Sequence, residues 1–176
     1  KKIFKNIHEK VNQASKDLAE ERGACPDAAE YGYKERFSNK TAIAPTASIS
    51  IICGGTSPGV EPIAANSFTH KTLSGSFNVR NRYLEKILEK HNKNDDETWS
   101  SITTNQGSVS HLDFLTQQEK DVFKTAFELD QKWIVELGAD RTPHISQAQS
   151  INIFVPADIH KKELHQIHFQ AWKKGL

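Results

Sequence analysis

The sequence predicts an α/β fold. Two apolar runs, residues 41–44 and 150–155, have the composition of buried strands. Four stretches, residues 2–22, 82–91, 116–137 and 158–174, repeat apolar residues every three or four positions, as amphipathic helices do. Helical and extended stretches alternate along the chain, which is typical of α/β proteins. Because two buried strands are too few to close a barrel, the sequence predicts part of one.

Charge and composition exclude several classes of protein. The formal net charge is +1, so no strong field favours binding to nucleic acid or to an anionic membrane. No apolar run approaches the roughly 20 residues that cross a bilayer. The N-terminal residues soon become charged, unlike a signal peptide. Two cysteines make no disulfide framework, which favours a cytoplasmic location. The absence of methionine favours a fragment or a processed chain.

The first predicted helix covers residues 2–22 and ends at Gly23, a favourable C-terminal cap. Ile3, Ile7, Val11, Ala14 and Leu18 form its apolar face. A polar connection follows over residues 24–40, and it contains Cys25, which we interpret as a loop thiol.

The chain is organised around residues 41–52, where Pro45 ends an apolar run and small or hydroxylated residues follow. This pattern predicts a strand that leads through a tight turn into a short helix. The first turn of a helix leaves up to four amides unpaired, and together with the helix dipole they form an anion site. The alternative is a plain N-cap, in which Thr46 or Ser48 satisfies local amides and nothing binds. No Walker A sequence is present.

Residues 53–62 are rich in glycine and proline, which predicts a loop that follows the short helix and lines the same pocket. Gly54 and Gly55 permit backbone conformations closed to other residues. Glu61 is the one ionisable carboxylate of this loop, and we expect it to have a structural hydrogen-bonding role rather than a chemical one.

The middle of the chain predicts an extended stretch and two helices. Apolar and polar residues alternate over part of residues 66–80, and the alternation is interrupted at residues 74–75. Asn81 is expected to cap a helix over residues 82–91. A shorter helix is expected over residues 97–104. The side chains predicted to point inward from these two helices are Tyr83, Leu84, Ile87, Leu88, Trp99 and Ile102.

The longest helix is predicted to begin at Thr116, with Glu119 completing a capping box, and to stop at Gly138. Its core stripe would consist of Val122, Ala126, Leu129, Trp133 and Leu137, widened by Phe123, Phe127 and Ile134. The last helix, residues 158–174, would bury Leu164, Ile167, Ala171 and Trp172. His165 and His168 lie on it three residues apart, but no third ligand accompanies them, so we predict no metal site.

Several motifs resemble the large (alpha) subunit of class I ribonucleoside-diphosphate reductase. The three main ones are APTASIS (residues 44–50), SPGVEP (57–62) and THKTLSGSF (69–77). Supporting motifs are NQGSV (105–109), DR (140–141), QAQSINI (147–153) and HFQAWKKGL (168–176). The resemblance covers essentially the whole chain in the family's order, most loosely in residues 1–40 and 89–104.

The resemblance implies a ten-stranded α/β barrel, of which residues 1–176 would be a single late segment, incomplete on its own. The family's segment that matches Pro45, Thr46, Ala47, Ser48, Ile49 and, less surely, Ser50 binds the substrate's diphosphate. The complete enzyme reduces ribonucleoside diphosphates to deoxyribonucleoside diphosphates by a thiyl-radical mechanism. It works with a small subunit that carries a di-metal radical centre, with ATP and deoxynucleotide effectors, and with thioredoxin or glutaredoxin.

The sequence also departs from the family pattern. The radical cysteine of the family lies in an Asn-x-Cys-x-Glu motif, which is absent, so neither Cys25 nor Cys53 inherits a catalytic role. The paired radical-transfer tyrosines would follow Leu176, and the C-terminal cysteine pair and the regulatory domain also have no counterpart. We therefore expect no catalytic residue and no cofactor in this segment, and no reductase activity from it alone.

Three interpretations follow for the chain. It is the phosphate-binding part of a reductase large subunit, a stand-alone phosphate or nucleotide binder, or a non-catalytic segment that completes a partner's barrel. Complementation with the other parts of a large subunit distinguishes them, because only the first interpretation predicts activity in the mixture.

Overall fold

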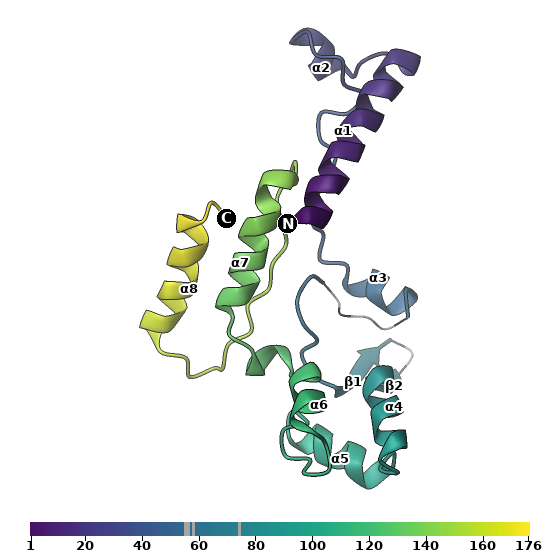
Figure 1. Cartoon of the computed structure of the whole chain (residues 1–176), viewed down its shortest axis with the longest axis vertical. Helices are drawn as coiled ribbons and strands as arrows, with labels where there is room; N and C mark the ends of the chain where they lie inside the picture. The colour runs from purple at the N-terminus through teal and green to yellow at the C-terminus, as the bar shows by residue number, and fades with distance from the viewer. Residues whose placement is uncertain (55–56, 58, 74) are drawn as a thin grey trace. The chain divides into compact units, whose positions relative to one another are not determined.

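The computed structural model describes residues 1–54, 57, 59–73 and 75–176, and these fall into two compact units. The first consists of Lys1–Pro45, Lys132–Ile151 and Ile159–Leu176; the second consists of Thr46–Gln131 and Asn152–Asp158. Figure 1 shows the elements of each. None of the helices in the described ranges is long and apolar enough to cross a membrane.

The first unit is helical. It contains α1 (Lys2–Arg22), α2 (Pro26–Glu30), α7 (Lys132–Arg141), the 3₁₀ helix η2 (Thr142–His144) and α8 (Lys161–Lys173). Helix α1 and its stop at Gly23, at a φ of 81°, confirm the prediction, whereas α2 lies where a plain connection was expected. Helices α7 and α8 lie side by side (Figure 1). The Glu136 carboxylate of α7 accepts a hydrogen bond from Gln170 Nε2 of α8 and forms an ion pair with Lys174, the residue that follows α8.

The two predicted strands are not formed as such. One parallel bridge joins Ile43 of the first stretch to Gln149, the residue just before the second, and the Ser150 amide donates to the Ile43 carbonyl. Residues 151–155 have no ladder partner in the described structure. No residue of either stretch is buried: residues 41–44 are alternately half-buried and exposed, and residues 150–155 are half-buried except for the exposed Asn152. The prediction of fully buried strands is therefore wrong. The bridge nevertheless places the start of one predicted strand parallel to the other.

The second unit contains the short helix α3 (Ala47–Ile52) and the strands β1 (Ser67–Thr72) and β2 (Gly75–Arg80), which form an antiparallel hairpin. Helices α4 (Arg82–Lys90), α5 (Asp96–Thr104) and α6 (Gln117–Val122) follow, and then the 3₁₀ helix η1 (Ala126–Glu128). These elements confirm the predicted short helix, extended stretch and capped helix. The predicted cap of α4 is present, because the Asn81 side chain accepts hydrogen bonds from the amides of Tyr83 and Leu84.

The core of this unit lies between α4, α5 and the chain that follows them. Its buried side chains are Leu84, Leu88, Trp99, Ile102, Val109, Leu112, Leu115 and Phe123. The inward positions predicted for α4 and α5 are confirmed, with one exception: Tyr83 is exposed.

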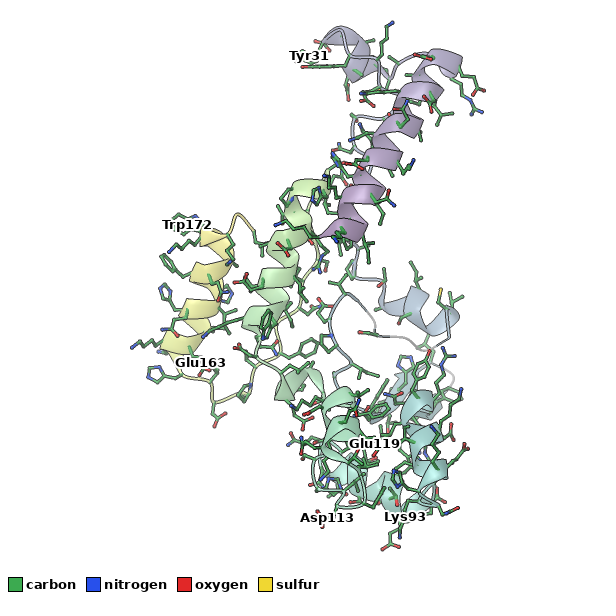
Figure 2. The ribbon with its side chains drawn as sticks, viewed as in Figure 1. Tyr31, Lys93, Asp113, Glu119, Glu163 and Trp172 are labelled. Atoms are coloured by element: carbon green, nitrogen blue, oxygen red, sulfur yellow. The ribbon has the colours of Figure 1, made fainter. Side chains whose placement is uncertain are left out.

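The single long helix predicted from Thr116 to Gly138 is wrong. The capping box at Thr116 and Glu119 is present, but α6 ends at Val122 and a second capping box at Thr125 starts η1. Of the predicted stripe, Trp133 and Leu137 are 67% and 55% exposed, and Val122 is exposed too. On α8, Ile167 is buried as predicted, whereas Trp172 is exposed (Figure 2).

Glu119 makes the start of α6 sensitive to pH. Its carboxylate accepts hydrogen bonds from the Thr116 amide and hydroxyl and lies 3.2 Å from His91 Nε2. These contacts, the Thr116 amide first, lower the pKa of Glu119 from 4.5 to about 2. A lowered folded-state pKa contributes stability above the unfolded value, and that contribution is lost as the pH falls from 4.5 toward 2.

We therefore expect Glu119→Gln to be destabilising near neutral pH, and the difference from wild type to shrink over this acid range. Denaturant unfolding at a series of pH values measures it. Glu89→Gln is the control, because the Glu89 carboxylate makes no hydrogen bond with the described residues. A difference for Glu119→Gln that stays constant down to acid pH would contradict the linkage.

Candidate functional site

The N-terminus of α3 presents backbone amides that the helix itself does not use. The first intrahelical bond runs from the Ser50 amide to the Thr46 carbonyl, 2.9 Å apart. The amides of Ala47, Ser48 and Ile49 precede it, and no acceptor is recorded for them within the described residues. All three residues are exposed.

The hydroxyl groups of this motif divide into two kinds. Ser50 is buried, and its hydroxyl donates to the Ala47 carbonyl at 2.7 Å, so its amide and its hydroxyl proton are both engaged inside the helix. For the hydroxyls of Thr46 and Ser48, the described part of the chain supplies no hydrogen-bond partner. The plain N-cap interpretation requires such a bond to a local amide, and the described residues contain none.

Thr46 has a backbone conformation that is unusual for its residue type. Its φ is 57°, in the left-handed region. A β-branched residue there is a conformational outlier, and strain of this kind costs on the order of 1–3 kcal/mol and concentrates at functional sites. The strained turn lets the chain pass directly from Pro45 into the first turn of α3.

The first turn of α3 contains no acidic residue, and its last turn contains no basic one. An anion at this end would therefore meet amides, hydroxyls and the positive end of the helix dipole, and no carboxylate of the first turn would repel it. Small side chains at Ala47 and Ser48 leave the backbone accessible.

The loop after α3 is fixed by side chains at several points. Gly54 has a φ of 95°, and a Cβ placed there would lie 3.3 Å from Arg82 Nη1, so the guanidinium lies close against the loop. The Ser57 hydroxyl donates to the Glu61 carbonyl. Glu61 Oε1 accepts from the amide of Asn152 at 2.5 Å, which confirms the predicted structural hydrogen-bonding role. Gly55 lies outside the described residues.

The remaining candidates carry no site. Cys25 is a half-buried free thiol and Cys53 is an exposed one. The His165 ring stacks on Phe169, and His168 Nδ1 lies 2.9 Å from the Leu164 carbonyl. The described residues contain no group of three or more His, Cys, Asp or Glu side chains that could hold a metal ion.

Three contacts between distant residues of this unit were not predicted from the sequence. Asn66 donates to the carbonyls of Gly107 and Phe123, Gln131 accepts from the Phe154 amide, and Arg82 lies against Gly54. Each joins residues that are 23 or more positions apart. No local pattern signals such pairs.

Comparison with known proteins agrees with the motifs. Residues 27–176 match the family described as "Ribonucleotide reductase, barrel domain". The ribonucleoside-diphosphate reductase large subunit of Invertebrate iridescent virus 6 is 49% identical over 178 residues, covering 99% of this chain and 18% of the viral protein. Large chain 2 of the Saccharomyces cerevisiae enzyme is 38% identical over 141 residues, covering 80% of this chain and 16% of the yeast protein.

A solved structure agrees in fold as well. The class Id ribonucleotide reductase alpha subunit of Actinobacillus ureae superposes with a TM-score of 0.86 at 38% identity, covering 99% of this chain and 31% of that one. The chain thus spans less than a third of the length of these relatives. It belongs to the ribonucleotide reductase large-subunit family and forms a portion of the barrel domain, as the motifs predicted.

Proposed function

We propose that this chain supplies the substrate-diphosphate site of a ribonucleoside-diphosphate reductase large subunit. The observation that carries the proposal is the set of exposed amides of Ala47, Ser48 and Ile49 at the start of α3, for which the described residues supply no acceptor. The hydroxyls of Thr46 and Ser48 add donors that have no partner in the described part of the chain. Pro45 sets the turn, and Ser50 supports the helix through its bond to the Ala47 carbonyl rather than through a free proton.

The reaction of the complete subunit follows from the family. The C2′–O bond of the ribose breaks, the hydroxyl leaves as water, a hydrogen takes its place, and a cysteine pair gives up two electrons. A thiyl radical starts the reaction, and a small radical subunit, nucleotide effectors and thioredoxin or glutaredoxin serve the complete enzyme. Neither Cys25 nor Cys53 lies in the radical-cysteine motif, so the role of this segment is to bind and orient the diphosphate.

Ser48→Ala tests the proposal in a complete large subunit that carries this segment. Loss of a charge-assisted hydrogen bond to a phosphate oxygen should weaken binding of a nucleoside diphosphate by roughly 1–3 kcal/mol. Binding of the parent nucleoside should not change, because it lacks the diphosphate. Isothermal titration with CDP and with cytidine measures both.

Ser50→Ala serves as the matched comparison, since the Ser50 hydroxyl is buried and donates within the helix. It should lower the CDP affinity less than Ser48→Ala does. Unchanged CDP affinity in the Ser48 variant, or an equal loss of cytidine binding, would contradict the proposal and favour a plain cap.

A further inference from the structure

Residues 35–40, which we call the returning segment, run back along α1 and are attached to it at two places (Figure 1). The first attachment is Ser15 of α1, which is 1% exposed. Its hydroxyl oxygen accepts hydrogen bonds from the amides of Arg36 and Phe37 at 3.1 and 3.3 Å. This attachment consists of neutral groups and belongs entirely to the first unit.

The second attachment of the returning segment is an ion that binds an amide. Lys40 Nζ lies 3.0 Å from the Glu35 carboxylate and donates to Asn12 Oδ1 of α1 at 2.8 Å. An ammonium group has three donors and no acceptor, so the Asn12 atom that faces it must be the carbonyl oxygen. The Asn12 amide nitrogen therefore lies at the other end, 2.9 Å from His8 Nε2.

This arrangement determines which nitrogen of His8 carries a proton. Asn12 Nδ2 can only donate, so His8 Nε2 has to accept. In a neutral imidazole the other nitrogen then carries the hydrogen, which makes His8 the Nδ1–H tautomer. The position of Lys40 thus decides the tautomer of His8 through a single amide group.

The surroundings of His8 supply no carboxylate to compensate for an added proton. The His144 ring of η2 faces the His8 ring, with the ring centroids 5.9 Å apart. The charged groups of this part of α1 and of the elements packed against it make other pairs: Lys1 with Asp140, Lys5 with Glu9, Lys40 with Glu35, and Arg141 over the Phe4 ring. Within the described residues, a proton on His8 Nε2 would therefore meet the amide protons of Asn12 and a second imidazole.

We propose that His8, Asn12 and Lys40 form a proton-sensitive clamp that holds the returning segment on α1. A proton on His8 Nε2 turns this acceptor into a donor, so that two donors face each other. Asn12 can offer its oxygen to His8 only by turning its amide away from Lys40. Histidine ordinarily changes charge between pH 5 and 8, so mild acid releases Lys40 while the Ser15 attachment remains. The clamp is independent of the proposed diphosphate site.

Glu35 does not titrate in this pH range. A hydrogen bond from Ser15, which has the largest effect, and the contacts with Lys40 hold the pKa of Glu35 below its usual 4.5. The ion pair between Lys40 and Glu35 therefore persists from pH 8 to pH 5. A response of the clamp within this range comes from histidine.

The test measures how fast Lys40 is acylated in the full chain, relative to the exposed Lys161, by mass spectrometry at pH 7.5 and pH 5.5. The intrinsic pH dependence of acylation is common to both amines, so their ratio changes only if Lys40 becomes more accessible. We expect the ratio to rise roughly fivefold in acid, as for one lost hydrogen bond. The ring-nitrogen chemical shifts of His8 at pH 7.5 should place its proton on Nδ1.

Two variants should abolish the rise. In His8→Gln the side-chain oxygen still accepts from Asn12, one turn away, but the side chain does not titrate. In Asn12→Asp both oxygens accept, so a protonated His8 and Lys40 can be held together. His144→Gln is the matched control and should keep the rise, because His144 faces His8 but makes no hydrogen bond to Asn12 in the described structure.

Several outcomes would overturn the proposal. A wild-type ratio that does not change with pH would refute the clamp, and a rise that persists in His8→Gln would assign the response to another group. If His8→Gln does not fold, a rise that persists in Asn12→Asp would refute it equally. Nitrogen shifts that place the proton on Nε2 would refute the assigned tautomer. A rise accompanied by loss of the helical circular dichroism signal would show general unfolding instead of release of one segment.

Discussion

Gly107→Ala is expected to destabilise the second unit by about 2–5 kcal/mol, the sum of backbone strain and overpacking. Gly107 has a φ of 81°, where an L-residue is strained. A Cβ would lie 2.4 Å from Ala65 Cβ, 2.7 Å from Ala65 Cα and 2.9 Å from the Asn66 amide nitrogen. Two of these atoms are backbone, so a side-chain rotation cannot relieve the clash. Denaturant unfolding of the chain, followed by circular dichroism, measures the loss.

Gly138→Ala is the matched control. Gly138 lies inside α7, and a Cβ there would meet the Cδ1 atom of Ile151 at 2.7 Å and the Leu176 side chain at 3.3 Å. These are the ends of flexible side chains, and alanine favours a helix interior by roughly 0.5–1 kcal/mol over glycine. We expect a net change of less than about 1 kcal/mol. Similar losses at both glycines would show that the backbone clash at Gly107 is not what matters.

Local sequence signals predicted most of the helices because their caps are local. The Asn81 side chain accepts hydrogen bonds from the amides two and three residues ahead, and Thr116 forms a capping box with Glu119. Gly23 stops α1 through its own positive φ. Such contacts depend on a few neighbouring residues, so the sequence contains what is needed to predict them.

The prediction of one helix from Thr116 to Gly138 was wrong because contacts with distant residues, rather than local ones, determine the structure there. The Phe123 carbonyl accepts from Asn66 Nδ2, and the Ala126 amide donates to the Ile63 carbonyl. These distant partners replace helical bonds, and Thr125 begins a new cap with Glu128. The apolar periodicity of the sequence continues across the break, but tertiary contacts determine the backbone conformation there. Gly138, expected to stop the helix, lies inside α7 instead.

The apolar runs at residues 41–44 and 150–155 predict fully buried strands, but in the structure their residues are half-buried or exposed. Their composition fits the interior of a barrel, and this chain spans 31% of the Actinobacillus ureae subunit. In the second run, buried side chains take the place of a neighbouring strand: Glu61 accepts from the Asn152 amide and Gln131 from the Phe154 amide. The composition of a segment indicates the environment that suits it, but it does not indicate which strand or side chain lies beside it.

The candidate site was predictable where its chemistry is local. A proline followed by small and hydroxylated residues predicted a short helix with unpaired amides, and α3 has that form. The difference between Ser48, whose hydroxyl has no partner among the described residues, and Ser50, whose hydroxyl donates to the Ala47 carbonyl, could not be predicted from the sequence. Nor could the link from Glu61 to Asn152, which spans 91 residues of sequence.

Asn66→Asp is expected to have the other large effect on this unit. Asn66 is 1% exposed, and its Nδ2 donates to the Gly107 carbonyl at 3.0 Å and to the Phe123 carbonyl at 2.7 Å. A carboxylate has no proton to donate, so two carbonyl oxygens would face a buried negative charge. An uncompensated buried charge costs about 3–5 kcal/mol, and unfolding free energies at neutral pH should show that loss.

The pH dependence of that loss distinguishes charge from shape. Burial raises the pKa of an introduced aspartate above its unfolded value, so its penalty grows as the pH rises and is relieved below the unfolded pKa of about 3.9. The comparison is Asn105→Asp, where the original Nδ2 also donates to a carbonyl, that of Ser101 at 2.9 Å, but at an exposed position. Water can replace that bond, and the cost should stay below about 1 kcal/mol. The loss of unfolding free energy in Asn66→Asp, measured against wild type at the same pH, should therefore diminish in acid. A loss that stays constant would mean that the shape of the amide, rather than its two protons, holds the carbonyls of Gly107 and Phe123 together.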